Sequence, residues 1–525
     1  MYAILRGMDI LAPEKLPDDV IELKQMLVKA HKDIWLLREQ VQFFKGKLFG
    51  RRSEVWSDAD LQQMRLFNEA EAGVEAKPKE EERETVTVPT YERGKPGRRK
   101  LPEGLPRVEV VHDLDAREKV CGCGASLSRI GQETSEQLDV IPAKVQVIRH
   151  IRYKYACKSC EGLEGEGPTV KIAPPAVQLI PKSIASAGLV AYVVSSKYED
   201  ALPFYRQEKQ FRRIGVELSR ATMCGWAIEA ANRCSPLIEL LEEEVRSGPL
   251  VRADETVLQV LKEPGRAATT KSYMWVFMGG AVGRPAVLYQ YHPSRAGEVA
   301  REFLKDYCGY VQTDGYAGYN ELSGVVGIVQ VGCWAHVRRK FFEVNKASKN
   351  ATSAKEAMRY IGRLYAVEHD ADTKELGPEE RRLLRQKEAV PVIEEFKRWL
   401  DQRVDQVPPQ SLLGKAIHYA LGQWERLVRY VEDGILTPDN NRVENVIRPF
   451  VTGRKNWLFA DTPRGAHASA ALYSLIETAK ANKIEPYWYL RYLFEKLPLV
   501  GSDPKDLKTL LPQYLDKNEL YVHPS

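Results

Sequence analysis

Three acidic residues lie where a carboxylate has a chemical rather than a solvent-facing role. Asp254 falls inside a segment, 251–261, whose composition predicts a strand, and Asp314 ends a second such segment at 310–314. Burying a carboxylate is costly unless it is paired or binds a cation. Glu444, in a predicted helix, is the best candidate for a third acid, and three carboxylates suit hard divalent cations. The alternative for each acid is a helix-capping or salt-bridged surface residue.

Two pairs of closely spaced cysteines predict a second kind of metal site. The pairs are Cys121 with Cys123 and Cys157 with Cys160. Four thiolates at two short spacings suit tetrahedral Zn²⁺. The Val- and Ile-rich stretch 136–155 alternates, which predicts two strands between the pairs. The segment 107–168 is therefore predicted to be a small zinc-binding β module; the alternative is a β module with reduced, unliganded cysteines.

Basic side chains accompany the third acid. Between Arg442 and Arg464 there are more Lys and Arg residues than acids, and Trp457 lies among them, a mixture that suits a DNA strand path. The residues predicted to contact phosphates are Arg448, Arg454 and Lys455, together with His336, Arg338 and Arg339 from a predicted helix at 334–344. His336 is alternatively a packed histidine.

The elements that must position the acids alternate between strands and helices. Three β-prone segments come first, and a helix, a strand, a helix, a strand and a helix follow them. The predicted strands are 251–261, 272–281, 285–291, 310–314 and 327–332. This order is typical of an α/β fold with a mixed sheet, and Asp314 is placed at a strand end, where open sheets bind ligands. The core is predicted in two parts, 250–345 and 434–497, separated by an all-helical insertion over 346–433.

The region 183–246 is predicted to be helical and to bind DNA. A helix ending at Arg213 is followed by a turn at Gly215 and by a second helix with Ser219 as its N-cap. This order fits a helix-turn-helix, in which Arg220 and Thr222 would face a DNA groove. The alternative is an ordinary helical bundle.

The N-terminal segment 18–48 carries an unbroken heptad pattern. The apolar positions are Val20, Leu23, Leu27, Ala30, Ile34, Leu37, Val41, Phe44 and Leu48. Their spacing predicts a leucine-zipper-like coiled coil, and the alternative is one helix packed on its own domain. An acidic linker is predicted over 68–90, and 498–525 is predicted to be a C-terminal tail.

Composition sets the remaining limits. The chain has 525 residues, with 77 Lys and Arg against 72 Asp and Glu, so only local clusters can attract nucleic acid. No stretch of about 18 apolar residues and no signal peptide is recognisable, so no membrane association is expected. The eight cysteines in a chain of this length are typical of a reducing compartment rather than a disulfide scaffold. A cytoplasmic protein is expected.

The order of several short motifs resembles the transposases of the insertion-sequence-66 family of bacterial mobile elements over nearly the whole chain. Each motif is weak alone, and their joint order is specific. The motifs include Leu48–Glu54, Ser135–Leu138, Arg152–Cys157, Ser196–Tyr198, Leu202–Gln207, Ala253–Thr256, Thr313–Tyr316, Cys333–Phe341, Asn441–Glu444 and Gly453–Phe459.

This resemblance implies a ribonuclease-H-like catalytic core of the DDE type, with Asp254, Asp314 and Glu444 as its three acids. Two Mg²⁺ (or Mn²⁺) ions would be held by these acids for cleavage and joining of DNA. The resemblance also implies a structural Zn²⁺, although the first cysteine pair here is one residue narrower than the family's pattern, which leaves the ligand set open. The expected partners are terminal inverted repeats, target DNA, a second copy of the chain and small accessory proteins, all at the bacterial nucleoid.

Two other functions stay open at this stage. A ribonuclease-H-like nuclease that cuts DNA without joining it would use the same acids and metals. A catalytically inactive DNA-binding protein derived from a transposase would keep the DNA-binding elements, and the presence of all three acids argues against it. A strand-transfer product distinguishes the transposase from both.

Overall fold

A computed structural model describes residues 17, 19–49, 145–156, 170–347, 352–516 and 520 of the chain. The chain divides into two compact units, one of residues 76–176 and one of the remainder. The four cysteines Cys121, Cys123, Cys157 and Cys160 and the predicted linker 68–90 lie outside the described residues. In the smaller unit, β1 (Lys154–Ala156) pairs antiparallel with β2 (Val170–Ile172).

Of the stretch 136–155, predicted to form two strands, residues 136–144 lie outside the described residues, and the described part contributes only Lys154 and Tyr155 to a strand. Residues 145–153 form no strand, and β1 takes its partner from beyond the second cysteine pair. Alternation alone was a poor guide here, because a strand forms only where a neighbour accepts its backbone hydrogen bonds.

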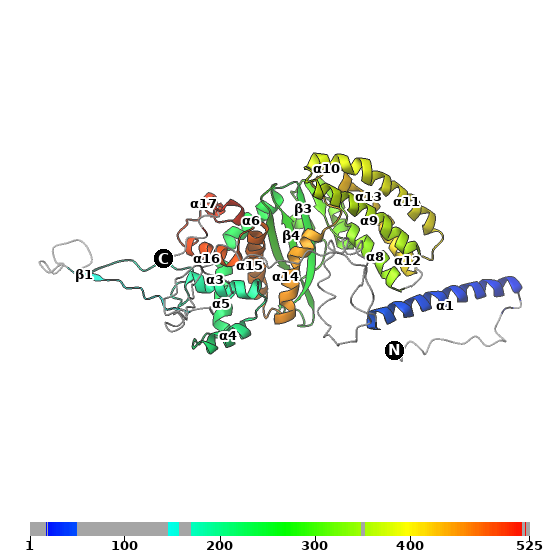
Figure 1. Ribbon diagram of the computed structural model, residues 1–525. Helices are drawn as coiled ribbons and strands as arrows, with labels where there is room; N and C mark the ends of the chain where they lie inside the picture. The colour runs from blue at the N-terminus through cyan, green and yellow to red at the C-terminus, as the bar shows by residue number, and fades with distance from the viewer. Residues whose placement is uncertain are drawn as a thin grey trace, which may run out of the picture. The chain divides into compact units, whose positions relative to one another are not determined.

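A five-stranded mixed sheet lies at the centre of the larger unit (Figure 1). Its strands are β3 (Leu250–Gln259), β4 (Lys271–Gly279), β5 (Ala286–His292), β6 (Gly309–Gln312) and β7 (Ile328–Val331). Their order is β5-β4-β3-β6-β7. Strand β4 is antiparallel to both of its neighbours, β3 and β5, whereas β6 is parallel to both of its neighbours, β3 and β7. The mixed sheet expected from the sequence is confirmed, with strand ends shifted by a few residues.

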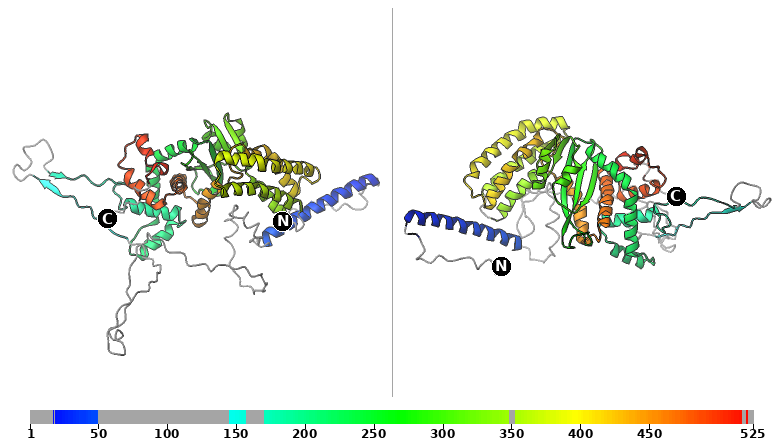
Figure 2. Two further views of the ribbon diagram at one scale, coloured as in Figure 1. Left: turned by 45° about the horizontal axis from the view of Figure 1, so that its top comes forward. Right: turned by 180° about the vertical axis from the view of Figure 1, so that it is seen from behind.

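Helices cover the sheet and complete one hydrophobic core with it (Figure 2). They are α3 (Ala187–Tyr198), α4 (Phe204–Arg213), α5 (Arg220–Arg233), α6 (Ser235–Arg246), α7 (Glu298–Phe303), the 3₁₀ helix η3 (Ala317–Gly324), α14 (Asn441–Trp457), α15 (Pro463–Ala481), α16 (Pro486–Lys496), α17 (Pro504–Lys508) and η6 (Pro512–Tyr514). The helices between 183 and 246 thus share their core with the sheet. The described part of the predicted tail contains the two short helices α17 and η6.

The outer edge of β5 is covered by α15. Ser474 Oγ accepts the Tyr289 N–H at 2.7 Å, and Thr478 Oγ1 accepts the Val287 N–H at 3.0 Å. These bonds occupy backbone donors that an edge strand would otherwise present to another chain. The sheet is therefore closed on this side by side-chain hydroxyls.

A second hydrophobic cluster holds the helices that precede α14. These are α8 (Trp334–Ala347), α9 (Thr352–Thr373), α10 (Pro378–Leu384), the π-helix η4 (Arg385–Ala389), α11 (Val390–Val404), α12 (Leu412–Gly422), α13 (Trp424–Val428) and η5 (Arg429–Val431). Its buried aromatic side chains include Trp334, Phe396 and Trp399. The segment predicted as a helical insertion is helical in its described residues.

The N-terminal heptad segment forms one helix, α1 (Val20–Phe49), which contacts α8. Asp19 Oδ1 accepts the Ile21 N–H at 2.9 Å, which satisfies one free donor at the helix start. Most of the apolar stripe stays solvent-exposed in the single chain, with Leu27 70% and Ile34 49% exposed. Within the described residues, no helix is both long and apolar enough to cross a membrane.

Candidate active site

The sheet register sets Asp254 beside Asp314. Strand β3 pairs in parallel with β6 at a constant offset of 60 residues, as in Leu250 with Tyr310 (310 − 250). The same offset (314 − 254) places Asp254 level with Asp314, which follows the end of β6. Adjacent parallel strands at this register bring the two carboxylates to the same edge of the sheet.

Glu444 reaches the same place because the start of α14 is tied to β3. Asn440 Nδ2 donates to the Ala253 carbonyl at 3.0 Å, one residue before Asp254. Asp439 Oδ1 accepts the Asn441 N–H at 3.1 Å, which satisfies one free donor at the helix start. Glu444 lies in the first turn of α14. The buried amide contact of Asn440 thus helps to bring Glu444 beside Asp254.

The end of α14 is also tied to β3. The Ala460 N–H donates to the Gln259 carbonyl at 2.9 Å, and the Leu261 N–H donates to the Ala460 carbonyl at 3.0 Å. Between the two ends, Arg454 Nη1 donates to Thr256 Oγ1 at 3.2 Å. The helix therefore runs along β3, and its Arg454 contacts that strand at Thr256, two residues after Asp254.

The three acids interact electrostatically. Burial raises the pKa of Asp254 well above its ordinary value, and the carboxylates of Glu255, Glu444 and Asp314 raise it further. A hydrogen bond from the Glu255 N–H, 2.9 Å from Asp254 Oδ1, opposes this rise only in part. A divalent cation would remove this repulsion.

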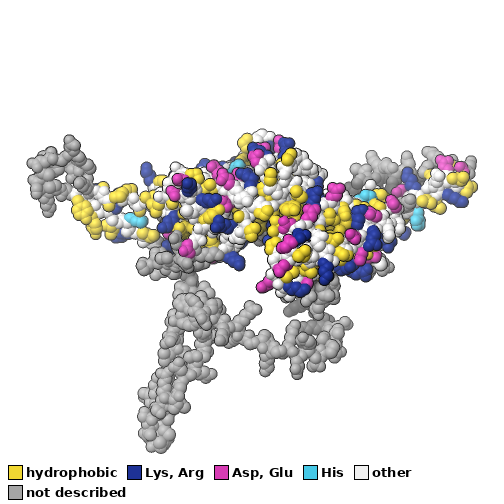
Figure 3. Space-filling view, turned by 90° about the horizontal axis from the view of Figure 1, so that it is seen from above, with side chains coloured by type: hydrophobic (Ala, Val, Ile, Leu, Met, Phe, Trp, Pro, Cys, Tyr) yellow, Lys and Arg dark blue, Asp and Glu magenta, His cyan; other side chains and the backbone are white. Residues whose placement is uncertain are grey.

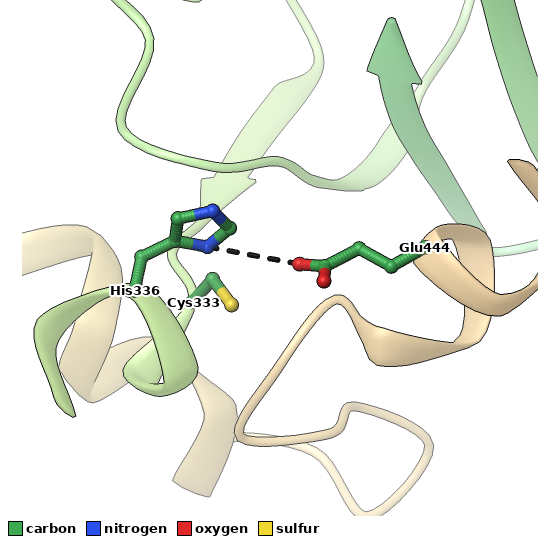
Figure 4. A group of neighbouring side chains, drawn as sticks. All are labelled: Cys333, His336 and Glu444. Carbon is green, nitrogen blue, oxygen red and sulfur yellow. Dashed lines mark ion pairs between the residues drawn. The ribbon is translucent and has the colours of Figure 1, made fainter. Parts of the chain in front are cut away.

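Glu444 has basic neighbours on α8. Figure 4 shows the His336 imidazole and the Glu444 carboxylate pointing toward each other, with Nδ1 3.8 Å from Oε1. Arg339 Nη2 lies 3.9 Å from Glu444 Oε2. Burial lowers the pKa of His336, against the opposing effect of the Glu444 charge, which favours the neutral imidazole near pH 7.

The residues present fit a divalent cation. Glu444 Oε1 is a buried carboxylate oxygen without a hydrogen-bond partner in the described part of the chain. An unpaired buried acceptor is costly, and cation binding satisfies it. Together with the raised pKa of Asp254, this makes Asp254, Asp314 and Glu444 a suitable set of oxygen ligands.

Two residues of this site were not predicted as functional. Glu255 is almost fully buried on β3 and accepts hydrogen bonds from Tyr319 Oη at 2.6 Å and Arg295 Nε at 2.8 Å. Cys333 is buried next to His336 and Glu444. Their signals in the sequence were an acid adjacent to Asp254 and a Cys-x-x-His spacing at a strand-to-helix junction.

The predicted DNA contacts lie in two parts of the larger unit. His336 and Arg339 approach Glu444, Arg454 contacts β3, and Lys455 is exposed on α14. Arg338 and Arg448 are half-buried on α8 and α14, the helices that carry His336 and Glu444. On the face in Figure 3, cationic and anionic side chains are interspersed, so local positions rather than a uniform basic surface matter for DNA contact.

Arg220 and Thr222 are not brought to the acids. Both are exposed at the start of α5, which packs against α3, α4 and α15. Ser219 caps this helix as predicted, with its Oγ accepting the Thr222 N–H at 3.1 Å. Gly215 forms the turn with a φ of 80°, a backbone conformation that favours glycine.

Family models match most of the chain. The one described as "Transposase IS66 family" matches residues 182–468, which is more than half of the chain. The others are "zinc-finger binding domain of transposase IS66" at 118–161, "Transposase C of IS166 homeodomain" at 36–110 and "IS66 C-terminal element" at 474–513. The second match includes all four cysteines of the predicted zinc module.

Similar proteins occur in Sinorhizobium fredii (strain NBRC 101917 / NGR234). Uncharacterized protein y4jD is 33% identical over 518 residues, which cover 96% of this chain and 97% of y4jD. Uncharacterized protein y4qI is 31% identical over 94% of this chain and 91% of its own length. The likeness thus extends beyond residues 182–468.

Proposed function

Because the chain belongs to the IS66 family of transposases, we propose that it cuts DNA at the ends of a mobile element and joins those ends to target DNA. The observation that carries this proposal is the convergence of Asp254, Asp314 and Glu444 from β3, β6 and α14. The order of the five strands supports a ribonuclease-H-like core. Three neighbouring carboxylates can hold the pair of divalent ions that many enzymes use for phosphoryl transfer on nucleic acids.

The chemistry needs no group beyond the acids, DNA, water and divalent ions. Water replaces one phosphodiester oxygen and leaves a 3′-OH at the element's end; that 3′-OH then replaces a target oxygen in the same way. Two Mg²⁺ or Mn²⁺ ions, when bound, supply Lewis-acid activation of the attacking oxygen and neutralise the leaving one. Asp254, Asp314 and Glu444 would hold the ions, and the Arg339 guanidinium, 3.9 Å from Glu444 Oε2, helps to orient Glu444.

The basic residues around the acids hold the DNA backbone in this proposal. Arg454 is positioned by Thr256 next to Asp254, and Lys455 and Arg448 extend the row along α14. Arg338 and Arg339, with His336, contribute from α8. Arg220 and Thr222 on α5, with the zinc module, recognise the terminal inverted repeats.

The exposed stripe of α1 joins two copies of the chain. A half-exposed row of apolar side chains on a 30-residue helix is unfavourable in water, and heptad spacing allows a second helix to cover it. Ile34→Lys, in the middle of the stripe, is expected to convert a dimer into a monomer in sedimentation equilibrium. Gln25→Lys, off the stripe, is the control and should remain dimeric. A monomeric wild type, or a dimeric Ile34→Lys protein, would count against the zipper.

A strand-transfer assay tests the proposed function. Purified protein, Mg²⁺, labelled DNA with the element's ends and a target plasmid are compared with the Asp314→Asn protein, with and without the element's small accessory proteins. Joined products from wild type alone support the transposase. Cleavage without joining under both conditions supports a nuclease. Binding to the ends without cleavage, in both proteins, supports an inactive DNA-binding protein and overturns the proposal.

A further inference from the structure

Three metal-binding side chains of different chemistry meet between β7 and α14. The donor atoms of Cys333, His336 and Glu444 all lie within 4.8 Å of one another (Figure 4). Cys333 lies between β7 and α8, His336 is in the first turn of α8, and Glu444 is in the first turn of α14. The contacts that fix α14 on β3 also bring its carboxylate to this cysteine and histidine.

Two buried polar atoms of this cluster have no hydrogen-bond partner in the described residues. His336 Nδ1 and Glu444 Oε1 are both buried without a hydrogen-bond partner in the described residues, and they face each other at 3.8 Å. The Cys333 sulfur is buried and accepts the Asn440 N–H at 3.3 Å. Buried polar atoms normally find partners, and one cation between these three donors would serve them all.

The donor set selects a different ion from Mg²⁺. Mg²⁺ prefers oxygen ligands in octahedral geometry, whereas thiolate and imidazole favour Zn²⁺ and similar ions. Donors bound to one tetrahedral Zn²⁺ lie about 3.4 Å apart, so small rotations of the Glu444 side chain bring its oxygen to bonding distance. Three protein ligands leave a fourth position open, as in many zinc sites.

We propose that Cys333, His336 and Glu444 form a binding site for Zn²⁺ or a similar borderline divalent ion, and that its occupation withdraws Glu444 from Asp254 and Asp314. Binding exchanges the thiol proton of Cys333 for a metal–sulfur bond, and the proton passes to solvent. Zinc then inhibits DNA cleavage that Mg²⁺ supports. The inhibition rests on the proposed function, whereas the binding itself does not.

Zinc content tests the site directly. Full-length wild type, Cys333→Ser and the matched control Cys308→Ser, an exposed cysteine outside the cluster, are dialysed against buffered Zn²⁺ and their zinc is counted per chain. The cysteine pairs Cys121/Cys123 and Cys157/Cys160 are present in all three and cancel in the comparison. Cys333→Ser should hold about one ion fewer per chain than the other two, which should agree. Equal zinc in all three proteins overturns the site.

His336→Asn gives a second, independent variant in case Cys333→Ser fails to fold, which circular dichroism would reveal. It should also lose about one ion. A His336→Asn protein that folds and keeps the wild-type zinc content overturns the site.

Zinc titration of the Mg²⁺-supported cleavage reaction tests the second half of the proposal. Half-inhibition should need at least about tenfold more Zn²⁺ for Cys333→Ser than for Cys308→Ser, since each 1.4 kcal/mol of lost affinity is tenfold. Equal sensitivity overturns the inhibitory role. If none of the proteins cleaves DNA, the proposed function fails, and the zinc content alone then decides whether the site exists.

Discussion

Asp254→Asn is expected to lower the rate of DNA cleavage by about a thousandfold, equivalent to roughly 4 kcal/mol of transition-state stabilisation. Asn keeps the shape of the side chain but removes the charge that holds a divalent ion. The same variant is expected to be more thermally stable than wild type when divalent ions are absent. Activity and stability should therefore change in opposite directions at this position.

The stability gain follows from the pKa of Asp254. Burial first, and then Glu255, Glu444 and Asp314, raise that pKa well above its ordinary value. A carboxyl with a raised pKa contributes stability at low pH that is lost as pH rises through the folded-state pKa. Asn does not titrate, so the variant loses no stability in this way as the pH rises. The difference in thermal stability between the variant and wild type should therefore be absent at acidic pH and should grow toward alkaline pH.

Calorimetry from pH 5 to 9 with a chelator, together with the cleavage assay, measures both effects. Asp461→Asn is the matched control, because Asp461 is exposed and pairs with Lys262 Nζ at 2.8 Å near the other end of β3. Asp461→Asn should change neither the cleavage rate nor the melting temperature appreciably. Wild-type cleavage by Asp254→Asn would refute the catalytic assignment, and an identical melting profile at every pH would refute the electrostatic argument.

Arg385→Met is expected to destabilise the helical insertion by about 3 kcal/mol. Arg385 is fully buried in η4, where its Nε and Nη2 donate to Glu368 at 2.7 and 2.8 Å. It also donates to the carbonyls of Tyr430, Asp433 and Leu436 at 2.8 to 2.9 Å. Methionine leaves a buried carboxylate and three carbonyls without this partner.

Urea unfolding followed by tryptophan fluorescence measures the loss, since Trp334 and Trp399 belong to the same core cluster. The control is Arg382→Met, which removes a surface pair with Glu379 and should change little. Adding Glu368→Met to Arg385→Met should recover part of the stability, because it removes a buried carboxylate that has lost Arg385 and keeps only Arg381, at 3.0 Å, as an arginine partner. A loss below about 1 kcal/mol for Arg385→Met, or no recovery in the double variant, would contradict this account.

The same substitution should also reduce cleavage. Arg385 holds the chain at Leu436, just before Asn440, which fastens the start of α14 to β3. Loosening this connection moves Glu444 relative to Asp254. A catalytic loss is therefore expected even though Arg385 does not belong to the acid cluster.

The sequence by itself determined most of the local elements and predicted Asp254, Asp314 and Glu444 as the acids of the site. The strands β3 to β7 depend on alternation and β-propensity, and the start of α5 depends on Ser219, which accepts the N–H of Thr222 three residues later. All of these signals are local in the sequence. Asp254 and Asp314 were recognisable because an acid within or at the end of an apolar strand is unusual. The resemblance then identified the family, which the comparisons confirm.

Only the tertiary structure decided how Glu444 meets them. It follows Asp314 by 130 residues (444 − 314), and the helices in between form their own core. The contact of Asn440 with Ala253, the buried Arg385 and the approach of Cys333 and His336 to Glu444 all join residues far apart in the chain. Such contacts depend on how whole elements pack, and no local pattern of residue types encodes that packing.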